Sequence, residues 1–288
     1  MTKTKVYIET LGCPKNFNDS EGIAGICAKA GMGITDNPYD ADVTVVNTCG
    51  FINDAKTESI NTIFDMVRLI ENNAADRDGG RQRLVVSGCL SQRYHTELAE
   101  EMPEVDYIIG VNDYERLPEI LAGGDRVCCS GAPANFTEFS ARRTDDNPYT
   151  ATLRIAEGCN NRCAYCVIPD IRGGYRSRPM ENILEEAQAL ADAGTREILL
   201  IAQDVTEYGR DLYGRLMLPE LLRKLCALGG DDLDKGFRWI RLMYCYEDKI
   251  TDELIDVMAS EKRICDYIDI PLQHVSDSVL KAMRRRST

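Results

Sequence analysis

Short β-rich runs alternate with longer helical patterns along this chain, and this alternation restricts the fold more than any other feature. Among the first 130 residues, runs rich in Val, Ile and Tyr are separated by stretches with apolar residues at helical spacing. Strands are expected at residues 5–10, 42–47, 83–88 and 105–110, and helices at 54–70 and 91–102. Strands that alternate with helices form βαβ units and pair in parallel. The sequence therefore predicts an α/β domain with a mostly parallel sheet.

The second half repeats the same rhythm. Strands are expected at residues 151–157, 196–204, 238–244 and 266–274. A helix is expected at 179–194, with Pro179 near its first turn and Gly194 just beyond its end, which are usual start and stop signals. A closed eight-unit barrel needs about 250 residues. The second half therefore predicts a partial (βα) barrel, truncated at its C-terminal end.

A polar stretch separates the two halves. Residues 131–150 contain two prolines and no sustained periodicity, which is typical of a linker. A chain of 288 residues is long enough for two domains with cores. We therefore expect an N-terminal domain at 1–130, a linker at 131–150 and an incomplete second domain at 151–288.

Composition narrows the cellular setting and the partners. No apolar run approaches the roughly 20 residues that span a bilayer, so we expect no membrane partner. The start "MTKTKVYIETLGC" enters a strand pattern directly, so we expect a cytoplasmic protein with no signal peptide. The formal net charge of -13 disfavours broad nucleic-acid affinity and suits a basic partner. Twelve cysteines in a reducing compartment favour metal or redox chemistry over disulfides.

Three of these cysteines form a compact motif in "EGCNNRCAYCVIPDIRGGYRSRP". Cys159, Cys163 and Cys166 follow the expected strand at 151–157, at the end where α/β folds place their active sites. A structural zinc site needs four ligands, whereas an iron-sulfur cubane held by three thiolates leaves one iron open for another molecule. The spacing therefore indicates an open iron-sulfur cluster rather than coincidental buried cysteines.

A second set of cysteines occupies equivalent positions in the first half. Cys13, Cys49 and Cys89 each follow an expected strand and precede a helical pattern. Because the carboxyl ends of parallel strands share one edge, the three thiols can converge, and helix N-termini favour the negative charge of a thiolate-bound cluster. Burial of three cysteines in the core is an equally good interpretation at this point.

The remaining cysteines show no ligand spacing and are assigned mainly to packing, with the adjacent pair at 128 and 129 left open: Cys27, Cys128, Cys129, Cys226, Cys245 and Cys265. His95 and His274 are far apart in sequence, and neither is assigned to a metal.

These motifs resemble a known family. "GCNNRCAYCVIPDIRGGYRSRP" resembles the cluster loop of radical S-adenosylmethionine (SAM) enzymes, and "LGCPKNFNDSE", "VNTCGFI" and "GCLSQRY" resemble the N-terminal domain of methylthiotransferases. "EVDYIIGVNDY", "IAQDVTEYG" and "YIDIPLQHVSDSVLKAM" look most like the RimO type, which modifies an aspartate β-carbon of a small-subunit ribosomal protein. The MiaB type, which modifies a transfer-RNA adenosine, is the alternative.

The resemblance implies two 4Fe-4S clusters, one on Cys13, Cys49 and Cys89 and one on Cys159, Cys163 and Cys166. It implies that the open iron of the second cluster binds S-adenosylmethionine and that an electron donor starts its cleavage to a 5′-deoxyadenosyl radical. That radical would abstract hydrogen from the substrate, and the first cluster would deliver a methylated sulfur, the methyl group coming from a second S-adenosylmethionine. The cofactors carry this chemistry, and the protein positions them. No catalytic side chain is assigned.

Other residues are expected near the cofactor. Tyr165 stands where relatives carry an aromatic residue near the adenine, with core packing as the alternative. Further cofactor contacts are expected from residues at the ends of the second and fourth strands or in the third: Gln203, Asp204, Arg241 and Gln273. The three loop arginines are interpreted as anchors of the loop through ion pairs: Arg172, Arg176 and Arg178.

The sequence departs from the family pattern in a few places. Family members continue through further barrel strands and a small β-rich domain, so we expect this chain to be a fragment, because an open sheet edge exposes unpaired backbone groups. Glu247 stands where many relatives have proline, and Arg286 where glycine is frequent. An iron-sulfur-binding fragment without turnover is therefore a further alternative to an active enzyme.

Overall fold

The computed structural model describes residues 3–74, 80–143, 149–230, 232 and 235–285. The chain divides into two compact units, which are described separately. The first unit comprises Met1–Ala132, Glu138–Arg143 and Asp170–Arg172, and the second comprises Pro133–Thr137, Thr144–Pro169 and Gly173–Thr288. The division of the chain at 1–130, 131–150 and 151–288 stays a prediction.

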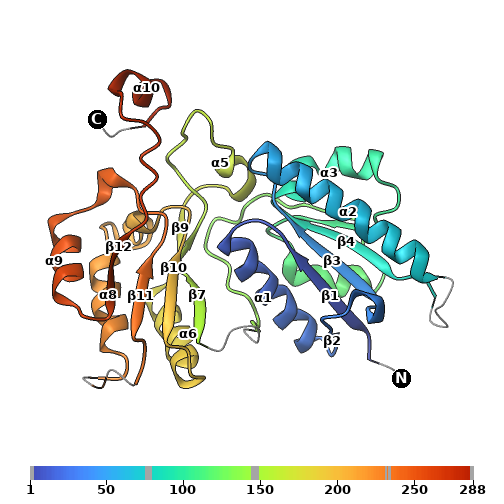
Figure 1. The fold of residues 1–288 in the computed structure, drawn as a ribbon, viewed down its shortest axis with the longest axis horizontal. Coiled ribbons are helices and arrows are strands. Elements are labelled where there is room, and N and C mark those ends of the chain that lie inside the picture. The colour runs from blue at the N-terminus through green and yellow to red at the C-terminus, as the bar shows by residue number, and fades with distance from the viewer. Residues whose placement is uncertain (1–2, 75–79, 144–148, 231, 233–234, 286–288) are drawn as a thin grey trace. The chain divides into compact units, whose positions relative to one another are not determined.

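The first unit is built on a six-stranded parallel sheet with the order β2-β1-β3-β4-β5-β6 (Figure 1). Its strands are β1 (Lys5–Thr10), β2 (Gly33–Ile34), β3 (Val43–Thr48), β4 (Arg83–Gly88), β5 (Tyr107–Ile109) and β6 (Val127–Cys128). Its helices are α1 (Pro14–Lys29), α2 (Asn53–Ala74), α3 (Cys89–Glu101) and α4 (Leu117–Leu121), with 3-10 turns at Pro38–Asp40 and Tyr114–Arg116.

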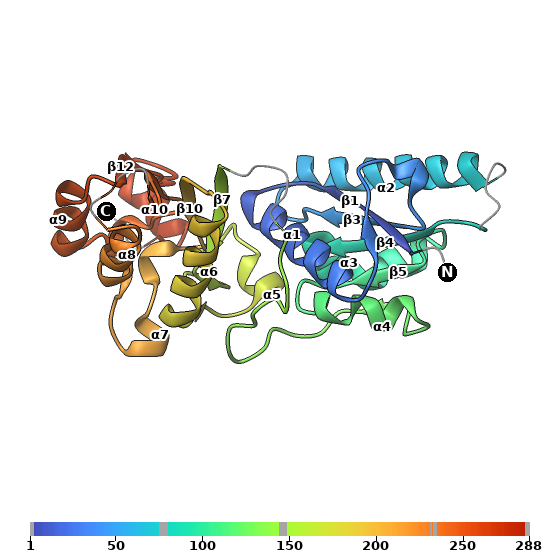
Figure 2. The ribbon, with the colours of Figure 1, turned by 90° about the horizontal axis from the view of Figure 1, so that it is seen from below.

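Helices cover both faces of this sheet, since side chains alternate along each strand. Val43 and Val45 pack in one cluster with α1 and α4, while Val46 packs in the other with α2 and α3. Figure 2 shows α2 and α4 on opposite sides of the strands. All six residues of β3 are buried, as expected for a central parallel strand covered on both faces.

The second unit contains a four-stranded parallel sheet with the order β12-β11-β10-β7 and a short antiparallel pair, β8 with β9. Its strands are β7 (Thr150–Arg154), β8 (Ala156–Glu157), β9 (Arg176–Ser177), β10 (Glu197–Ile201), β11 (Trp239–Leu242) and β12 (Ile264–Ile268). Its helices are α6 (Met180–Asp192), α7 (Arg210–Tyr213), α8 (Leu218–Ala227), α9 (Asp252–Ser260) and α10 (Asp277–Ala282), with 3-10 turns at Val205–Glu207 and Glu247–Lys249; the boundary between the units falls within α5 (Ile168–Arg172).

One face of the second sheet carries the apolar core. Alternate side chains of β7, β10 and β11 pack with α6, α8 and α9, for example Leu153, Leu200 and Leu242. The intervening positions, such as Thr152, Leu199 and Arg241, therefore lie on the opposite face.

The predicted α/β class is confirmed, and the differences from the predicted elements are local. The two-residue strands β2 and β6 were missed because they are too short to show periodicity. The predicted fourth strand at 266–274 is wrong at its end, since β12 stops at Ile268. Pro271 lacks a backbone donor, and β12 is an edge strand with a partner on one side in the described sheet. No described helix of the chain is long and apolar enough to cross a membrane.

Candidate iron-sulfur sites

Cys13, Cys49 and Cys89 lie just beyond the carboxyl ends of β1, β3 and β4, which are adjacent strands in the first sheet. After β1 the chain forms β2 on one side of it, and after β3 it forms β4 on the opposite side, so the direction of strand addition reverses between β1 and β3. Parallel α/β sheets bind ligands at such reversals, outside the carboxyl strand ends. The topology therefore places the predicted thiol set at the edge where a ligand is expected.

The buried side chain of Asn16 connects the loops that carry these cysteines. Its amide nitrogen donates hydrogen bonds to the carbonyls of Leu11 (2.8 Å) and Thr48 (3.0 Å). Its amide oxygen lies 4.0 Å from Cys13 Sγ and 3.9 Å from Cys89 Sγ. One side chain thus contacts two of the three thiols. Sequence analysis missed Asn16, although its place in the first turn of the helix after Cys13 was a usable signal.

Cys49 is held through its backbone and by a close glycine. Its N–H donates to Ser59 Oγ on α2, and that hydroxyl donates back to the Cys49 carbonyl, both at 3.0 Å. Gly12 has a φ of +93°, and a Cβ at this position would lie 2.8 Å from Cys49 Cβ and 3.2 Å from its Sγ. The loop before Cys13 therefore approaches Cys49 as closely as only glycine permits.

A buried cation completes the first site. Arg172 Nη2 donates to Asp19 Oδ2 on α1 at 2.8 Å and to Cys89 Sγ at 3.3 Å. The side chains of Arg172 and Asp19 are 2% and 1% exposed. The predicted ion-pair role of Arg172 is confirmed, but its contact with a predicted ligand sulfur was missed, because Arg172 is 83 residues from Cys89 in sequence.

Burial and charge act in opposite directions on these thiols. Burial raises the pKa of both Cys49 and Cys89, while the nearby Arg172 guanidinium lowers the pKa of each and also donates its hydrogen bond to Cys89. Burial has the larger effect, so the net pKa shift is upward in both. Metal ligation needs the deprotonated thiolate, so a positive metal ion or cluster would have to supply the missing charge compensation.

The second triplet lies in the loop after β8. Gly158 has a φ of +77°, and a Cβ there would lie 2.1 Å from the Gly174 carbonyl oxygen, so the loop needs glycine to fold against residues 173 and 174. The Cys159 N–H donates to the Gly173 carbonyl at 3.1 Å, and the Cys166 N–H donates to the Cys163 carbonyl at 3.0 Å. Burial raises the pKa of Cys159 to about 11.

Tyr246 is a polar partner of Cys163. Its hydroxyl lies 2.9 Å from Cys163 Sγ. The Arg285 guanidinium lies 3.9 Å from the centre of the Tyr246 ring, and Lys249 Nζ lies 4.7 Å from it. Arg285 also pairs with Glu247 at 2.7 Å. Two positively charged side chains therefore lie against the tyrosine that contacts this sulfur.

Asp204 anchors the same loop through a buried network. Its Oδ1 accepts hydrogen bonds from Thr206, and its Oδ2 accepts them from Asn161 (3.0 Å) and Lys249. Asp204 and Lys249 are 1% and 7% exposed. These bonds connect the cysteine loop, the end of β10 and the turn at Glu247–Lys249. The predicted contact of Asp204 with a cofactor stays a prediction.

The other expected cofactor residues take varied positions. Tyr165 is 42% exposed, so the core-packing alternative is wrong. Gln203 donates to Glu157, and its buried Oε1 has no hydrogen-bond partner in the described structure. Arg241 pairs with Glu197 at 2.8 Å. Gln273 does not directly follow a strand, because it lies in the loop after β12, with a φ of +66°.

The remaining sequence assignments concern loop anchors and packing. Arg178 pairs with Glu186, which confirms its predicted ion pair, and Arg176 donates to the Gly174 carbonyl at 2.7 Å. Cys27 and Cys226 lie within apolar cores, as predicted. Cys128 and Cys245 are also buried core residues, and Cys129 is partly buried against a core. Cys128 Sγ also accepts a hydrogen bond from Arg116 at 2.7 Å.

In the part of the chain that the structure describes, no three His, Cys, Asp or Glu side chains are arranged to hold a single metal ion. A four-iron cluster is larger than one ion, so ligands for it stand farther apart. The donor chemistry fits such a cluster at both cysteine sites. At the first site, three thiols lie near the buried Arg172. At the second site, one loop carries three thiols, and the buried Gln203 Oε1 has no hydrogen-bond partner in the described structure. The six cysteines as cluster ligands stay a prediction.

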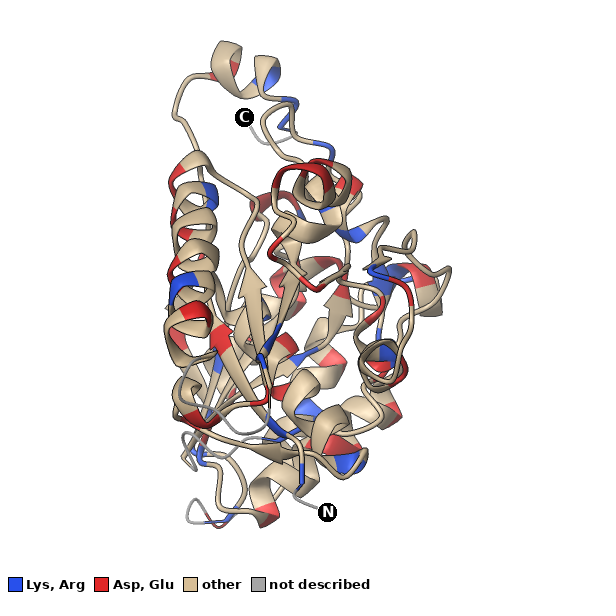
Figure 3. Cartoon of the chain, turned by 90° about the vertical axis from the view of Figure 1, so that its right-hand side faces the viewer, with Lys and Arg blue, Asp and Glu red and all other residues tan. Residues whose placement is uncertain are grey.

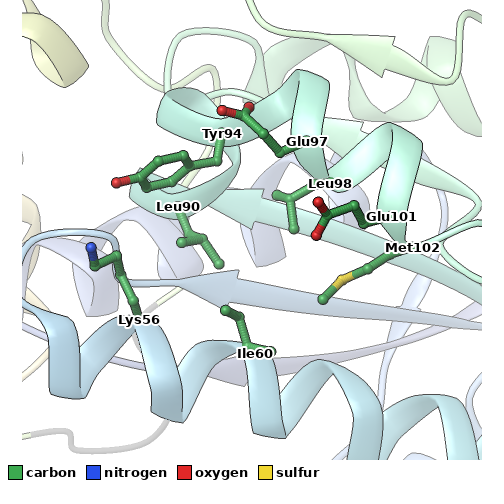
Figure 4. A pocket seen from close by; sticks show the side chains of 8 residues that line it. All are labelled: Lys56, Ile60, Leu90, Tyr94, Glu97, Leu98, Glu101 and Met102. Carbon is green, nitrogen blue, oxygen red and sulfur yellow. The ribbon is translucent and has the colours of Figure 1, made fainter.

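A separate pocket of about 280 Å³ lies between α2 and α3 (Figure 4). It is lined by Lys56, Ile60, Leu90, Tyr94, Glu97, Leu98, Glu101 and Met102. None of the predicted ligand or cofactor residues is among them, so this pocket is distinct from both cysteine sites.

Two family models match the chain. Residues 5–110 match "Uncharacterized protein family UPF0004", and residues 153–288 match "Radical SAM superfamily". Among solved structures, TsrM from Kitasatospora setae, a radical S-adenosylmethionine methyltransferase, has a TM-score of 0.68 at 14% identity, covering 99% of this chain and 61% of that one. The match over residues 153–288 and the structural likeness to TsrM therefore define a protein with a radical SAM fold in its second unit.

Curated relatives name the particular family. Proteins named "Ribosomal protein uS12 methylthiotransferase RimO" are 46% identical in Lachnoclostridium phytofermentans, over 98% of this chain, and 48% identical in Geobacter sulfurreducens, over 99%. The chain spans 62% of the length of each. It belongs to the radical SAM methylthiotransferase family, and these relatives are of the RimO type.

Proposed function

We propose that this chain carries the two cluster-binding units of a methylthiotransferase that adds a methylthio group to the β-carbon of an aspartate in ribosomal protein uS12. The observation that carries the proposal is the 46–48% identity, over nearly the whole chain, to proteins named for that activity. The two cysteine sets at the carboxyl strand ends support it, because this activity needs two thiolate-bound clusters.

Each cysteine triplet would hold one 4Fe-4S cluster. Cys13, Cys49 and Cys89 would hold the first, and Cys159, Cys163 and Cys166 the second, beside which S-adenosylmethionine would bind. When bound, these groups supply one-electron radical chemistry and the transferable sulfur and methyl groups.

The surrounding residues would orient the loops that carry the cysteines. Asn16 and Ser59 fix the loops of the first site, and Asp204 with Lys249 fixes the loop of the second. The unsatisfied Gln203 Oε1 would accept a hydrogen bond from the amino group of S-adenosylmethionine, which has N–H donors to offer.

The charge of the chain supports a basic substrate. Asp and Glu outnumber Lys and Arg by 47 to 34, and the acidic positions are spread over many elements (Figure 3). Such a field favours encounter with a basic ribosomal protein over a nucleic acid. We also propose a cytoplasmic location, where twelve free thiols stay reduced, and an external electron donor.

Iron content tests the two sites. Anaerobic reconstitution should give about eight irons per chain, the sum for two four-iron clusters. The Cys159→Ala, Cys163→Ala, Cys166→Ala variant and the Cys13→Ala, Cys49→Ala, Cys89→Ala variant should each retain about half, as measured by iron, sulfide and Mössbauer analysis. The matched control, Cys27→Ala, Cys226→Ala, Cys245→Ala, removes three buried core thiols and should keep all of the iron. About four irons that depend only on the second triplet would contradict the sulfur-donor role of the first.

The substrate is tested separately. The reconstituted chain, and a version extended to the length of its relatives, would be incubated with S-adenosylmethionine, a reductant and either uS12 or transfer RNA. We expect 5′-deoxyadenosine and a methylthio group on uS12, detected by mass spectrometry. Modified transfer RNA and unmodified uS12 would overturn the substrate assignment, and no 5′-deoxyadenosine from the extended version would overturn the activity.

A further inference from the structure

Arg172 is a cation buried against a predicted ligand sulfur. Its side chain is 2% exposed, and arginines this buried are rare unless they are paired. Its Nη2 faces two different groups, the Asp19 carboxylate at 2.8 Å and Cys89 Sγ at 3.3 Å. Asn16 Oδ1, which also contacts Cys13 and Cys89, lies 3.4 Å from the same nitrogen. One guanidinium nitrogen therefore lies among the side chains that surround the first thiol set.

We infer that Arg172 is a positioning residue that donates an N–H hydrogen bond to the Cys89 sulfur when this cysteine ligates a cluster, and that it thereby makes this cluster easier to reduce. The inference rests on the proposed function, since it needs a cluster at the first triplet. Hydrogen bonds to ligand sulfurs and nearby positive charge stabilise the reduced, more negative state of a cluster. Groups next to the ligands commonly tune a metal site in this way.

Asp19 has the opposite electrostatic effect and a geometric one. Its carboxylate partly compensates the guanidinium charge, so the net field at Cys89 depends on both residues. Because Asp19 lies on α1, which begins directly after Cys13, the ion pair also aims Arg172 at the thiols. The two residues are 153 positions apart in sequence, so this arrangement is built by tertiary packing.

A purely structural ion pair is the competing explanation, and the same helix offers a matched control. Arg142 pairs with Glu21 on α1 at 2.6 Å, two residues beyond Asp19. Both arginines come from segments distant in sequence and join the same helix. If ion pairing alone matters, replacing either arginine should affect folding stability and leave the reduction potential of the cluster unchanged.

The test uses the full 288-residue chain with Cys159, Cys163 and Cys166 replaced by alanine, so that any cluster is bound at the first triplet. Arg172→Gln, Arg172→Lys, Asp19→Asn and the control Arg142→Gln are made in this background. Iron content, urea unfolding and the midpoint potential, from a redox titration followed by electron paramagnetic resonance, are measured for each.

Arg172→Gln should lower the ratio of reduced to oxidised cluster about tenfold at a fixed potential, a shift of about 59 mV to lower midpoint. Arg172→Lys, which keeps the charge but loses the planar donor, should shift it less, and Asp19→Asn should shift it upward. Arg142→Gln should leave it unchanged. Equal midpoints for Arg172→Gln and Arg142→Gln overturn the inference. If Arg172→Gln does not fold, the opposite signs of Arg172→Lys and Asp19→Asn decide. A parent without iron instead refutes the proposed function at this site.

Discussion

Replacing Gly88 with alanine should destabilise the first unit more than the same replacement of a glycine that has open space around it. Gly88 ends β4 and directly precedes Cys89, and its φ of +100° and ψ of -157° lie in a region open almost only to glycine. A Cβ at this position would lie 2.4 Å from the Thr48 carbonyl oxygen and 2.7 Å from the Thr48 nitrogen. These are backbone atoms of the neighbouring strand, paired in register with Gly88, so they cannot move aside locally.

Two contributions determine how much free energy of unfolding the Gly88→Ala variant loses. The unfavourable backbone conformation costs about 1–3 kcal/mol. The overlap with a packed strand adds about 1–3 kcal/mol. The expected loss in the free energy of unfolding is therefore about 2–6 kcal/mol, a large part of the stability of a typical domain.

Gly123→Ala is the matched control. Gly123 has a φ of +119° in the same unit, but a Cβ there would meet no atom within 4 Å. It should lose only the backbone contribution, about 1–3 kcal/mol. Urea unfolding of the cluster-free chain, followed by far-ultraviolet circular dichroism, measures both variants. A Gly88→Ala variant as stable as Gly123→Ala would refute the argument from the close approach of β3.

Two further predictions concern buried ionisable groups. Burial raises the pKa of Cys27 to about 12 in the folded chain, so above about pH 9 the unfolded state loses this proton first and the free energy of unfolding falls as pH rises. Between about pH 9 and 12, the excess stability of the cluster-free parent over Cys27→Ala should therefore shrink by about 1.4 kcal/mol per pH unit. A constant difference between the two proteins would contradict the buried position of this thiol. Lys249→Met leaves the Asp204 carboxylate buried without its cation and should destabilise the second unit by about 3–5 kcal/mol, as measured by urea unfolding followed by Trp239 fluorescence. The control Lys224→Met breaks an exposed pair with Glu220 and should cost at most about 1 kcal/mol. Similar losses in both variants would refute the role of the buried pair.

The positions of the cysteines were predictable because they depend on local patterns. Strands such as 83–88 have strong apolar runs, and parallel pairing follows from their alternation with helices. Cys13, Cys49 and Cys89 were therefore placed at strand ends without knowing the sheet order. Boundaries were less predictable where tertiary pairing decides them, as at the end of β12.

The partners of the cysteines were not predictable in the same way. Asn16, Tyr246 and Arg172 contact thiols at separations of up to 83 residues, and no local periodicity encodes such contacts. The hydrogen-bond network of Asp204 was not predictable either, because Asn161 and Lys249, which donate to its carboxylate, are 43 and 45 residues away in sequence.

By itself, the sequence determined the α/β class, the two cysteine triplets and the strand ends on which they lie, since periodicity, turn residues and ligand spacing are properties of short segments. Only the tertiary structure decided that the strand order reverses between β1 and β3, that Arg172 lies against Cys89, and that Tyr246 lies against Cys163. These arrangements arise when distant segments bury their charges and apolar faces together, and the free energy of that burial belongs to the folded chain as a whole.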